Sequence, residues 1–325
     1  MTSSPSSEFR VAVLDDYQDV ARSYADFASL PGHTEVVVFR DHLQQEAALA
    51  ARLSDFDAII AMRERTPFTR SLLAALPRLK LLVTTGMRNA SIDIAAARER
   101  GVLVCGTEGL PYPTAELTIG LILALARKIP LEDRATREGA WQVSVGTGLS
   151  GKTLGLLGLG RLGSRVARVA VAFDMRVIAY SQNLTAARAA EHGAELVSFD
   201  ALLSESDVLS VHLVLSERTR GLVGARELAQ MKPSALLINT SRGPIVDEAA
   251  LVSALEARTI AGAALDVFDE EPLPSAHALR RLDNTVITPH LGYVTDETYR
   301  IFYGQALEDV AAYLRGEPIR TIATQ

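Results

Sequence analysis

The hydrophobic positions in the first third of the chain predict an alternation of strands and helices. Short runs of valine, isoleucine and leucine predict strands at residues 11–14, 35–39, 57–60, 79–85 and 102–106. Segments between most of these runs predict helices, as at 46–53, 69–76 and 93–100. Continuous apolar strands that alternate with helices are typical of a parallel sheet covered on both faces. We therefore expect one α/β domain of about five strands here.

A second series of the same kind begins at Lys152. Its apolar runs predict strands at residues 153–158, 176–180, 194–199, 208–213, 235–240, 261–267 and 285–289. Helical segments separate most of these strands as well. The predicted fold class is therefore α/β, with two doubly wound parallel-sheet domains.

Three segments lie outside the two series. Residues 111–129 predict one long helix with prolines at its start and Thr114 as a candidate cap. Residues 141–150 are rich in glycine, serine and threonine and predict a loop. Residues 296–316 predict a last helix, for which the first domain is the expected packing partner.

A glycine-rich turn lies between the first strand and the first helix of the second series. Gly158, Gly160 and Gly163 have the spacing G-x-G-x-x-G, with Arg161 and Leu162 between the last two. Gly158 permits a tight turn, Gly160 lets the backbone approach a pyrophosphate, and Gly163 lets helix and strand pack closely. Because the strand–helix–strand unit is complete, it predicts a dinucleotide site more strongly than a glycine turn without a ligand.

The end of the next strand does not decide between NAD and NADP. An acid that binds the ribose hydroxyls of NAD is expected there, but the chain has Ser181 followed by Gln182. A serine removes the negative charge that would repel a 2′-phosphate. No arginine follows directly, and Arg188 lies farther along, so both cofactors remain open.

Composition narrows the range of partners. The net charge is −6 with no block of like charges, which argues against nucleic acid or an anionic membrane as the main partner. The one cysteine, Cys105, lies in an apolar run, so we expect a buried thiol and no disulfide framework or metal site. Residues 1–10 have no features of a secretory signal and are expected to be a short disordered lead-in, so we expect a cytoplasmic protein.

Four motifs together resemble the D-isomer-specific 2-hydroxyacid dehydrogenase family over nearly the whole chain. They are "GKTLGLLGLGRLG" at the glycine turn, "INTSRGPIVDEAALVSAL" at 238–255, "GAALDVFDEEPLP" at 262–274 and "TPHLG" at 288–292. The segment "TAELTIGLILALARKI" is also similar to the helix between the domains of that family. The resemblance implies an NAD(P)-dependent enzyme that interconverts 2-keto acids and D-2-hydroxy acids.

The resemblance implies three catalytic residues. Arg242 matches the arginine that binds the substrate carboxylate and carbonyl, His290 matches the general acid/base, and Glu271 matches the glutamate that pairs with the histidine. The chemistry needs these residue types, because an imidazole titrates near neutral pH, a carboxylate orients it, and a guanidinium binds a carboxylate through two parallel hydrogen bonds. Each alone would be an ordinary structural or surface residue, and only their combination favours catalysis.

The resemblance also supplies the cofactor pocket. His212 is expected to be a wall of this pocket rather than an acid, and Gly292 to approach the nicotinamide. The remaining pocket positions implied by the family are Leu213, Val214, Thr219, Thr240, Ser241 and Asp266, with Arg242 and His290 at the reacting end. The other four histidines, His33, His42, His192 and His277, are expected to face solvent.

The candidate substrate loop departs from the family pattern. It is "GMRNASID" at 86–93, where Arg88 replaces a glycine and Ala90 replaces an aspartate. Arg88 either faces solvent or enters the cleft, and we favour the cleft, where a charged or bulkier acid would fit. Tyr293 stands where the family commonly has a serine and would narrow the pocket or stack on the substrate. The candidate substrate contacts are Arg63, Met87, Arg88, Asn89 and Arg242.

The resemblance also implies the domain organisation. A Rossmann-type cofactor domain at 111–290 is inserted into a flavodoxin-like substrate domain at 8–110 and 291–325, with the active site in the cleft between them. We expect a homodimer whose contact includes the helix from Thr114. Glyoxylate, hydroxypyruvate or a larger 2-keto acid are the candidate substrates.

Two other readings of the same fold stay open. A dinucleotide-sensing corepressor-like protein would bind the cofactor without turnover, and a phosphite-type dehydrogenase would oxidise a substrate that is not a hydroxy acid. The Glu271–His290 pair argues against formate. No regulatory domain is expected after Gln325, which disfavours the long phosphoglycerate dehydrogenases.

Overall fold

The structure is a computed structural model that describes residues 8–323, and it divides into two compact units. Unit 1 comprises the chain up to Leu110 and from Thr295 onward, and unit 2 comprises Pro111–Val294. The chain returns from unit 2 to unit 1 after Val294, four residues beyond the boundary expected between residues 290 and 291. Residues 291 and 292 stay with unit 2 because the Asp266 carboxylate accepts both of their N–H groups, at 2.7 and 2.8 Å.

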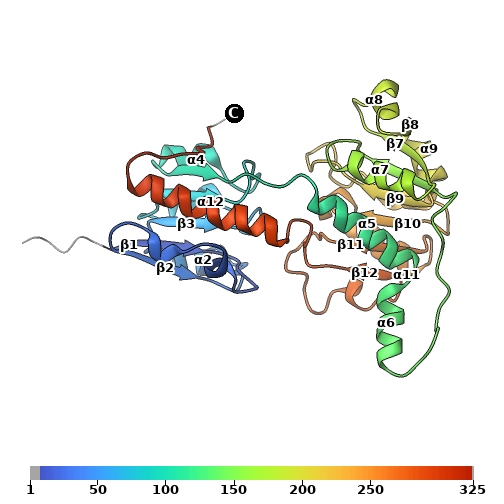
Figure 1. The fold of residues 1–325 in the computed structure, drawn as a ribbon, viewed down its shortest axis with the longest axis horizontal. Helices are drawn as coiled ribbons and strands as arrows, with labels where there is room; N and C mark the ends of the chain where they lie inside the picture. Colours follow the sequence, from blue (N-terminus) through green and yellow to red (C-terminus); the bar gives the residue numbers. More distant parts are fainter. Residues whose placement is uncertain (1–7, 324–325) are drawn as a thin grey trace, which may run out of the picture. The chain divides into compact units, whose positions relative to one another are not determined.

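Unit 1, drawn in blue, cyan and red in Figure 1, contains a parallel sheet. Its strand order is β2-β1-β3-β4-β5, which is the flavodoxin order. The strands are β1 (Phe9–Val13), β2 (Thr34–Val38), β3 (Ala58–Ala61), β4 (Leu81–Thr84) and β5 (Leu103–Gly106). The helices are α1 (Ala21–Tyr24), α2 (Glu46–Leu53), α3 (Arg70–Ala74), α4 (Ile94–Glu99) and α12 (Asp296–Leu314), with a 3₁₀ turn at Phe27–Ser29.

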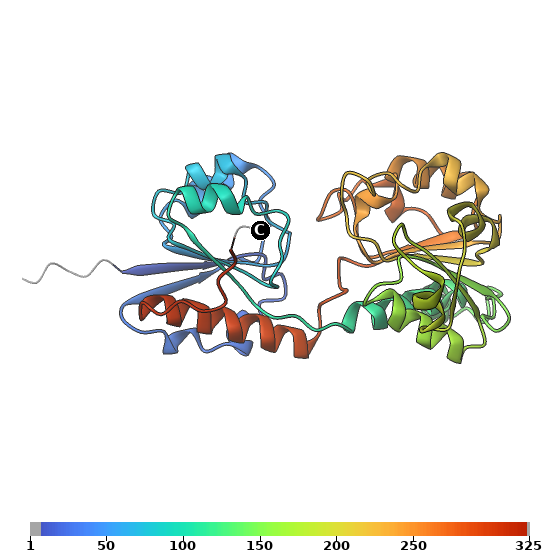
Figure 2. The same cartoon turned by 90° about the horizontal axis from the view of Figure 1, so that it is seen from above.

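Helices cover both faces of this sheet. The long helix α12 packs against α1, β4 and β5, whereas α2, α3 and α4 pack together on the opposite face (Figure 2). The strands β3 and β4 are buried throughout, as the continuous apolar runs require. Cys105 is fully buried in β5, which confirms the expected buried thiol, and burial raises the pKa of this thiol to about 12.

Unit 2 contains a seven-stranded parallel sheet in the order β12-β11-β10-β9-β6-β7-β8. Its strands are β6 (Thr153–Leu157), β7 (Arg176–Tyr180), β8 (Ala194–Leu196), β9 (Val208–Val211), β10 (Leu236–Asn239), β11 (Gly262–Leu265) and β12 (Thr285–Ile287). The order reverses between β6 and β9, which is the doubly wound arrangement of Rossmann-type domains. Both predicted sheets and the predicted fold class are therefore confirmed.

Two apolar cores lie on the two faces of the second sheet. The helices are α5 (Pro113–Ala126), α6 (Ile129–Arg137), α7 (Gly163–Ala172), α8 (Ala186–Ala190), α9 (Phe199–Glu205), α10 (Ala225–Gln230) and α11 (Glu248–Glu256), with 3₁₀ turns at Gly243–Ile245 and Ala278–Arg280. Side chains of α5 and α7 fill one core, and those of α9, α10 and α11 fill the other.

Three sequence predictions need correction. The helix predicted at 111–129 ends early, at Ala126, and a separate helix begins at Ile129, because Lys128 takes a left-handed conformation with φ of 54°. Tyr112 occupies the N-cap of α5, and Thr114 donates instead to the Gly292 carbonyl at 2.8 Å. The first strand starts at Phe9, inside the predicted lead-in, of which residues 1–7 lie outside the described residues.

Candidate functional site

The turn between β6 and α7 has no room for a side chain at two of its three glycines. Gly158 has a φ of 104°, and a Cβ there would lie 2.7 Å from the His212 carbonyl oxygen. A Cβ on Gly163 would lie 2.3 Å from the Gly158 carbonyl oxygen, so both positions exclude a side chain. A Cβ on Gly160 would meet no atom within 4 Å, which leaves open space beside the first turn of α7. Leu162 gives this helix no side-chain cap. The N–H groups of Ser164 and Arg165 donate to the carbonyls of Gly160 and Leu162 at 2.9 and 3.0 Å, so an anion here would meet the N–H groups that precede Ser164.

The end of β9 lies next to this turn. His212 follows β9, and its Nε2 lies 2.9 Å from the Ser210 hydroxyl. Burial lowers the pKa of His212 to about 4, so the ring is neutral at physiological pH. A neutral imidazole suits the predicted role of a pocket wall. Beyond it, Thr219 donates to the Val214 carbonyl at 2.8 Å and shapes the loop in which Val214 is exposed.

The end of β10 presents Thr240, Ser241 and Arg242 in a tight turn. The Asn239 amide donates to the Arg242 carbonyl at 2.9 Å and accepts the Ser241 N–H at 3.0 Å, which fixes the turn. Ser241 donates to the Leu213 carbonyl and so ties this turn to the loop after β9. One guanidinium nitrogen of Arg242 donates to the Ser241 carbonyl at 2.7 Å.

A pair of threonine hydroxyls connects the same turn to helix α5. The Thr240 hydroxyl lies 2.8 Å from the Thr118 hydroxyl, and both residues are buried. Asn239 and Thr118 were not singled out from the sequence. No sequence pattern indicated the role of Thr118, because its partner hydroxyl lies 122 positions away in the chain.

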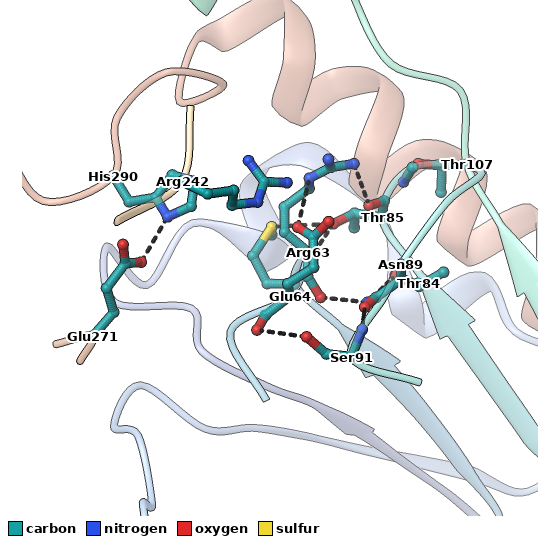
Figure 3. Close-up of polar contacts among 12 residues, drawn as sticks. Arg63, Glu64, Thr84, Thr85, Asn89, Ser91, Thr107, Arg242, Glu271 and His290 are labelled. Carbon is teal, nitrogen blue, oxygen red and sulfur yellow. Dashed lines mark hydrogen bonds and ion pairs between the residues drawn. The ribbon is translucent and has the colours of Figure 1, made fainter. Parts of the chain in front are cut away.

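The ends of β11 and β12 bring a histidine and a glutamate together. Nδ1 of His290 lies 2.6 Å from Oε2 of Glu271, as the dashed line in Figure 3 marks. The other oxygen of Glu271 accepts the Phe268 N–H at 2.9 Å, which orients the carboxylate. The two side chains keep 17% and 27% of their surface exposed, so a small molecule can reach them.

Asp266 organises the backbone around His290. Its buried carboxylate accepts from the Thr288 hydroxyl at 2.6 Å and from the N–H groups of Leu291 and Gly292. Burial raises the pKa of Asp266, and these donors oppose that shift. His290 has a left-handed φ of 54°, a conformation that non-glycine residues adopt only where surrounding contacts require it. The Tyr293 ring lies edge-on to the imidazole, 5.6 Å between centroids.

In unit 1, the candidate substrate residues follow β3 and β4. Arg63 donates through Nη1 to the Thr85 carbonyl at 2.9 Å and lies over Gly86, where a Cβ would collide with it. The buried Asn89 donates to the Arg63 carbonyl at 2.6 Å and to the Thr84 hydroxyl at 2.8 Å (Figure 3). Asn89 therefore joins the two loops, while Met87 and Arg88 are exposed.

Two of the histidines predicted to face solvent have acidic partners. The side chain of His42 is buried, with Nδ1 2.8 Å from an Asp15 oxygen, so the prediction is wrong for His42. His277 lies 3.1 Å from Glu248 and keeps 23% of its side-chain surface exposed. The sequence did not indicate either pair, because the acidic partners lie 27 and 29 positions away.

The fold and the glycine turn define an α/β protein with a dinucleotide-binding domain, and comparison with known proteins identifies its family. The model described as "D-isomer specific 2-hydroxyacid dehydrogenase, NAD binding domain" matches residues 119–292. The chain belongs to the D-isomer specific 2-hydroxyacid dehydrogenase family, which confirms the resemblance and, at the level of the family, the predicted dehydrogenase.

The two similar proteins described next have different names. The chain is 37% identical to D-3-phosphoglycerate dehydrogenase of Archaeoglobus fulgidus over 96% of its own length and 58% of the relative's. It is 43% identical to glyoxylate reductase of Aeropyrum pernix over 76% of each chain. The crystal structure of a phosphoglycerate oxidoreductase from Vibrio cholerae matches with a TM-score of 0.90 at 38% identity, covering 95% of this chain and 99% of that one.

Within residues 8–323, no helix combines the length and the apolar character that crossing a membrane requires.

Proposed function

We propose that the protein is an NAD(P)-dependent oxidoreductase that interconverts a 2-keto acid and a D-2-hydroxy acid. The observation that supports this most is the 2.6 Å contact between His290 and Glu271 in a domain with a dinucleotide-binding turn. When bound, the nicotinamide would supply or accept the hydride at the carbonyl carbon.

His290 is the proposed general acid and base. Because Nδ1 is engaged by the Glu271 carboxylate, Nε2 is the nitrogen that gives a proton to the carbonyl oxygen in reduction and removes it in oxidation. Glu271 stabilises the protonated imidazole and holds its ring, and the Phe268 N–H holds Glu271 in turn.

Arg242 is the proposed substrate anchor. A guanidinium forms two parallel hydrogen bonds with a carboxylate, which fixes the orientation of the adjacent carbonyl. The bond from Nη1 of Arg242 to the Ser241 carbonyl restricts the side chain, and the Asn239 amide holds the turn beneath it.

The glycine turn and the loops after β9 and β10 form the proposed cofactor site. Open space beside Gly160 and the uncapped start of α7 fit a pyrophosphate. Arg63, Met87 and Arg88 remain the proposed substrate contacts of unit 1, with Asn89 holding Arg63 in place.

Substrate class and turnover can be tested with purified protein and a panel of 2-keto acids that includes glyoxylate, hydroxypyruvate and phosphohydroxypyruvate. We expect absorbance at 340 nm to fall with NADH or NADPH for at least one of them. The relatives named glyoxylate reductase and D-3-phosphoglycerate dehydrogenase motivate this choice. Tight cofactor binding without turnover would instead indicate a sensor, and oxidation of phosphite alone would indicate a phosphite-type dehydrogenase.

A homodimer is proposed on the basis of exposed apolar residues in unit 2. Ile129, Trp141 and Val145 are 52%, 79% and 87% exposed, and they belong to α6 and the loop that follows it. Exposed apolar groups of this kind mark association surfaces. We expect light scattering to give twice the chain mass of 35.0 kDa, and Trp141→Ser with Val145→Ser to lower it. A monomeric mass for the unmodified protein would refute the dimer.

A further inference from the structure

An arginine from a later part of the chain lies beside the end of β7, although the residues that directly follow β7 include no arginine. Nη1 of Arg218 donates to Oε1 of Gln182 at 2.9 Å. Arg218 belongs to the loop after β9, whereas Gln182 follows β7, so the contact joins the ends of two strands that flank β6. Arg218 is therefore brought to the position beside Ser181, where a dinucleotide-binding domain holds the adenosine ribose.

The positive charge of Arg218 has no acidic partner. Within residues 8–323, no carboxylate forms an ion pair with its guanidinium, and its side chain is exposed. Arg176, at the start of the same strand β7, is different, because Glu195 and Glu205 lie 2.7 and 2.6 Å from it. A guanidinium with an uncharged amide as its partner keeps its remaining N–H donors for an anion.

The residues around Arg218 also lack the acid that favours NAD. Ser181 and Gln182 are uncharged, and Ser181 is half-buried at the end of β7. An aspartate there would accept both ribose hydroxyls and would repel a 2′-phosphate, whereas a serine does neither. The Gln182 amide holds one arm of the guanidinium, which reduces the conformational freedom that Arg218 would lose when it binds a phosphate.

We propose that Ser181, Gln182 and Arg218 form a binding site for the 2′-phosphate of the adenosine ribose, so that the protein binds NADP(H) more tightly than NAD(H). This inference rests on the proposed cofactor site. The Ser181 hydroxyl and the free arm of Arg218 donate to the phosphate oxygens, and the Arg218 charge offsets part of the phosphate charge.

Calorimetry with NADPH, NADH and adenosine 2′,5′-bisphosphate tests the site without any turnover. We expect NADPH to bind at least about tenfold more tightly than NADH, from the gain of charged hydrogen bonds. Arg218→Ala should weaken binding of NADPH and of the bisphosphate by about tenfold to a hundredfold, and change NADH binding by less than about twofold. Ser181→Asp should reverse the preference toward NADH.

Arg188→Ala is the matched control, because this exposed arginine of α8 follows the same strand, whereas the side-chain oxygen of Gln182 accepts its hydrogen bond from Arg218. It should leave the preference unchanged. Equal binding of the two cofactors by the unmodified protein, or an equal loss of both in Arg218→Ala, would overturn the 2′-phosphate site. Failure of the unmodified protein to bind either cofactor would instead refute the proposed function, and the phosphate site with it.

Discussion

Replacing His290 with glutamine should lower kcat by about 10²- to 10⁴-fold, the range that general acid–base catalysis contributes. Glutamine keeps a polar side chain of similar size, but it does not exchange a proton near neutral pH. Binding of the reduced cofactor should stay nearly unchanged, because the glycine turn and the loop after β9 do not depend on the imidazole. Steady-state rates with the best 2-keto acid, together with fluorescence titration of the cofactor, measure both effects.

The control for this variant is another histidine. His192 lies after α8, away from the ends of β11 and β12, so His192→Gln should leave kcat unchanged. If His290→Gln retained more than about a tenth of the original kcat, the proton would have to come from another group. The general acid assignment would then be wrong.

Replacing Arg242 with lysine should lower kcat/KM by about 10²- to 10⁴-fold, which corresponds to the loss of two charged hydrogen bonds. Lysine keeps the positive charge but cannot form the two parallel bonds that orient a carboxylate. The loss should therefore appear in kcat as well as in KM, because a misoriented carbonyl reacts slowly even when bound.

Arg168→Lys is the control for this substitution, since Arg168 is an exposed residue of α7. It should behave like the unmodified protein. If Arg242→Lys changed KM alone, Arg242 would bind the substrate without orienting it. An unchanged kcat/KM would remove Arg242 from the substrate site altogether.

The parts of the fold that depend on local sequence could be predicted. Continuous apolar runs identified both parallel sheets, and the spacing of Gly158, Gly160 and Gly163 identified a turn in which the first and last glycine leave no room for a side chain. These features are local, because a strand needs only a run of residues and the turn needs only its glycines. The pairing of Glu271 with His290 was expected from the family motifs and not from their spacing.

The features that the sequence did not predict depend on long-range contacts. Arg218 meets Gln182 across 36 positions, and His42 meets Asp15 across 27. Neither pair leaves a pattern in the sequence, since their positions depend on which strands become neighbours. The break between α5 and α6 was missed for a different reason. Lys128 adopts a left-handed conformation that its residue type does not favour, so neither the apolar pattern nor a glycine marks the end of α5.

The origin of the hydrogen at the substrate's second carbon tests the central claim most directly. The protein would reduce its best 2-keto acid in ordinary water with a cofactor that carries deuterium at the reacting position of the nicotinamide, and mass spectrometry would locate the label. Direct hydride transfer, with His290 supplying only the hydroxyl proton, predicts one deuterium bound to C2 of the D-2-hydroxy acid. A product with no deuterium at C2 would contradict the account.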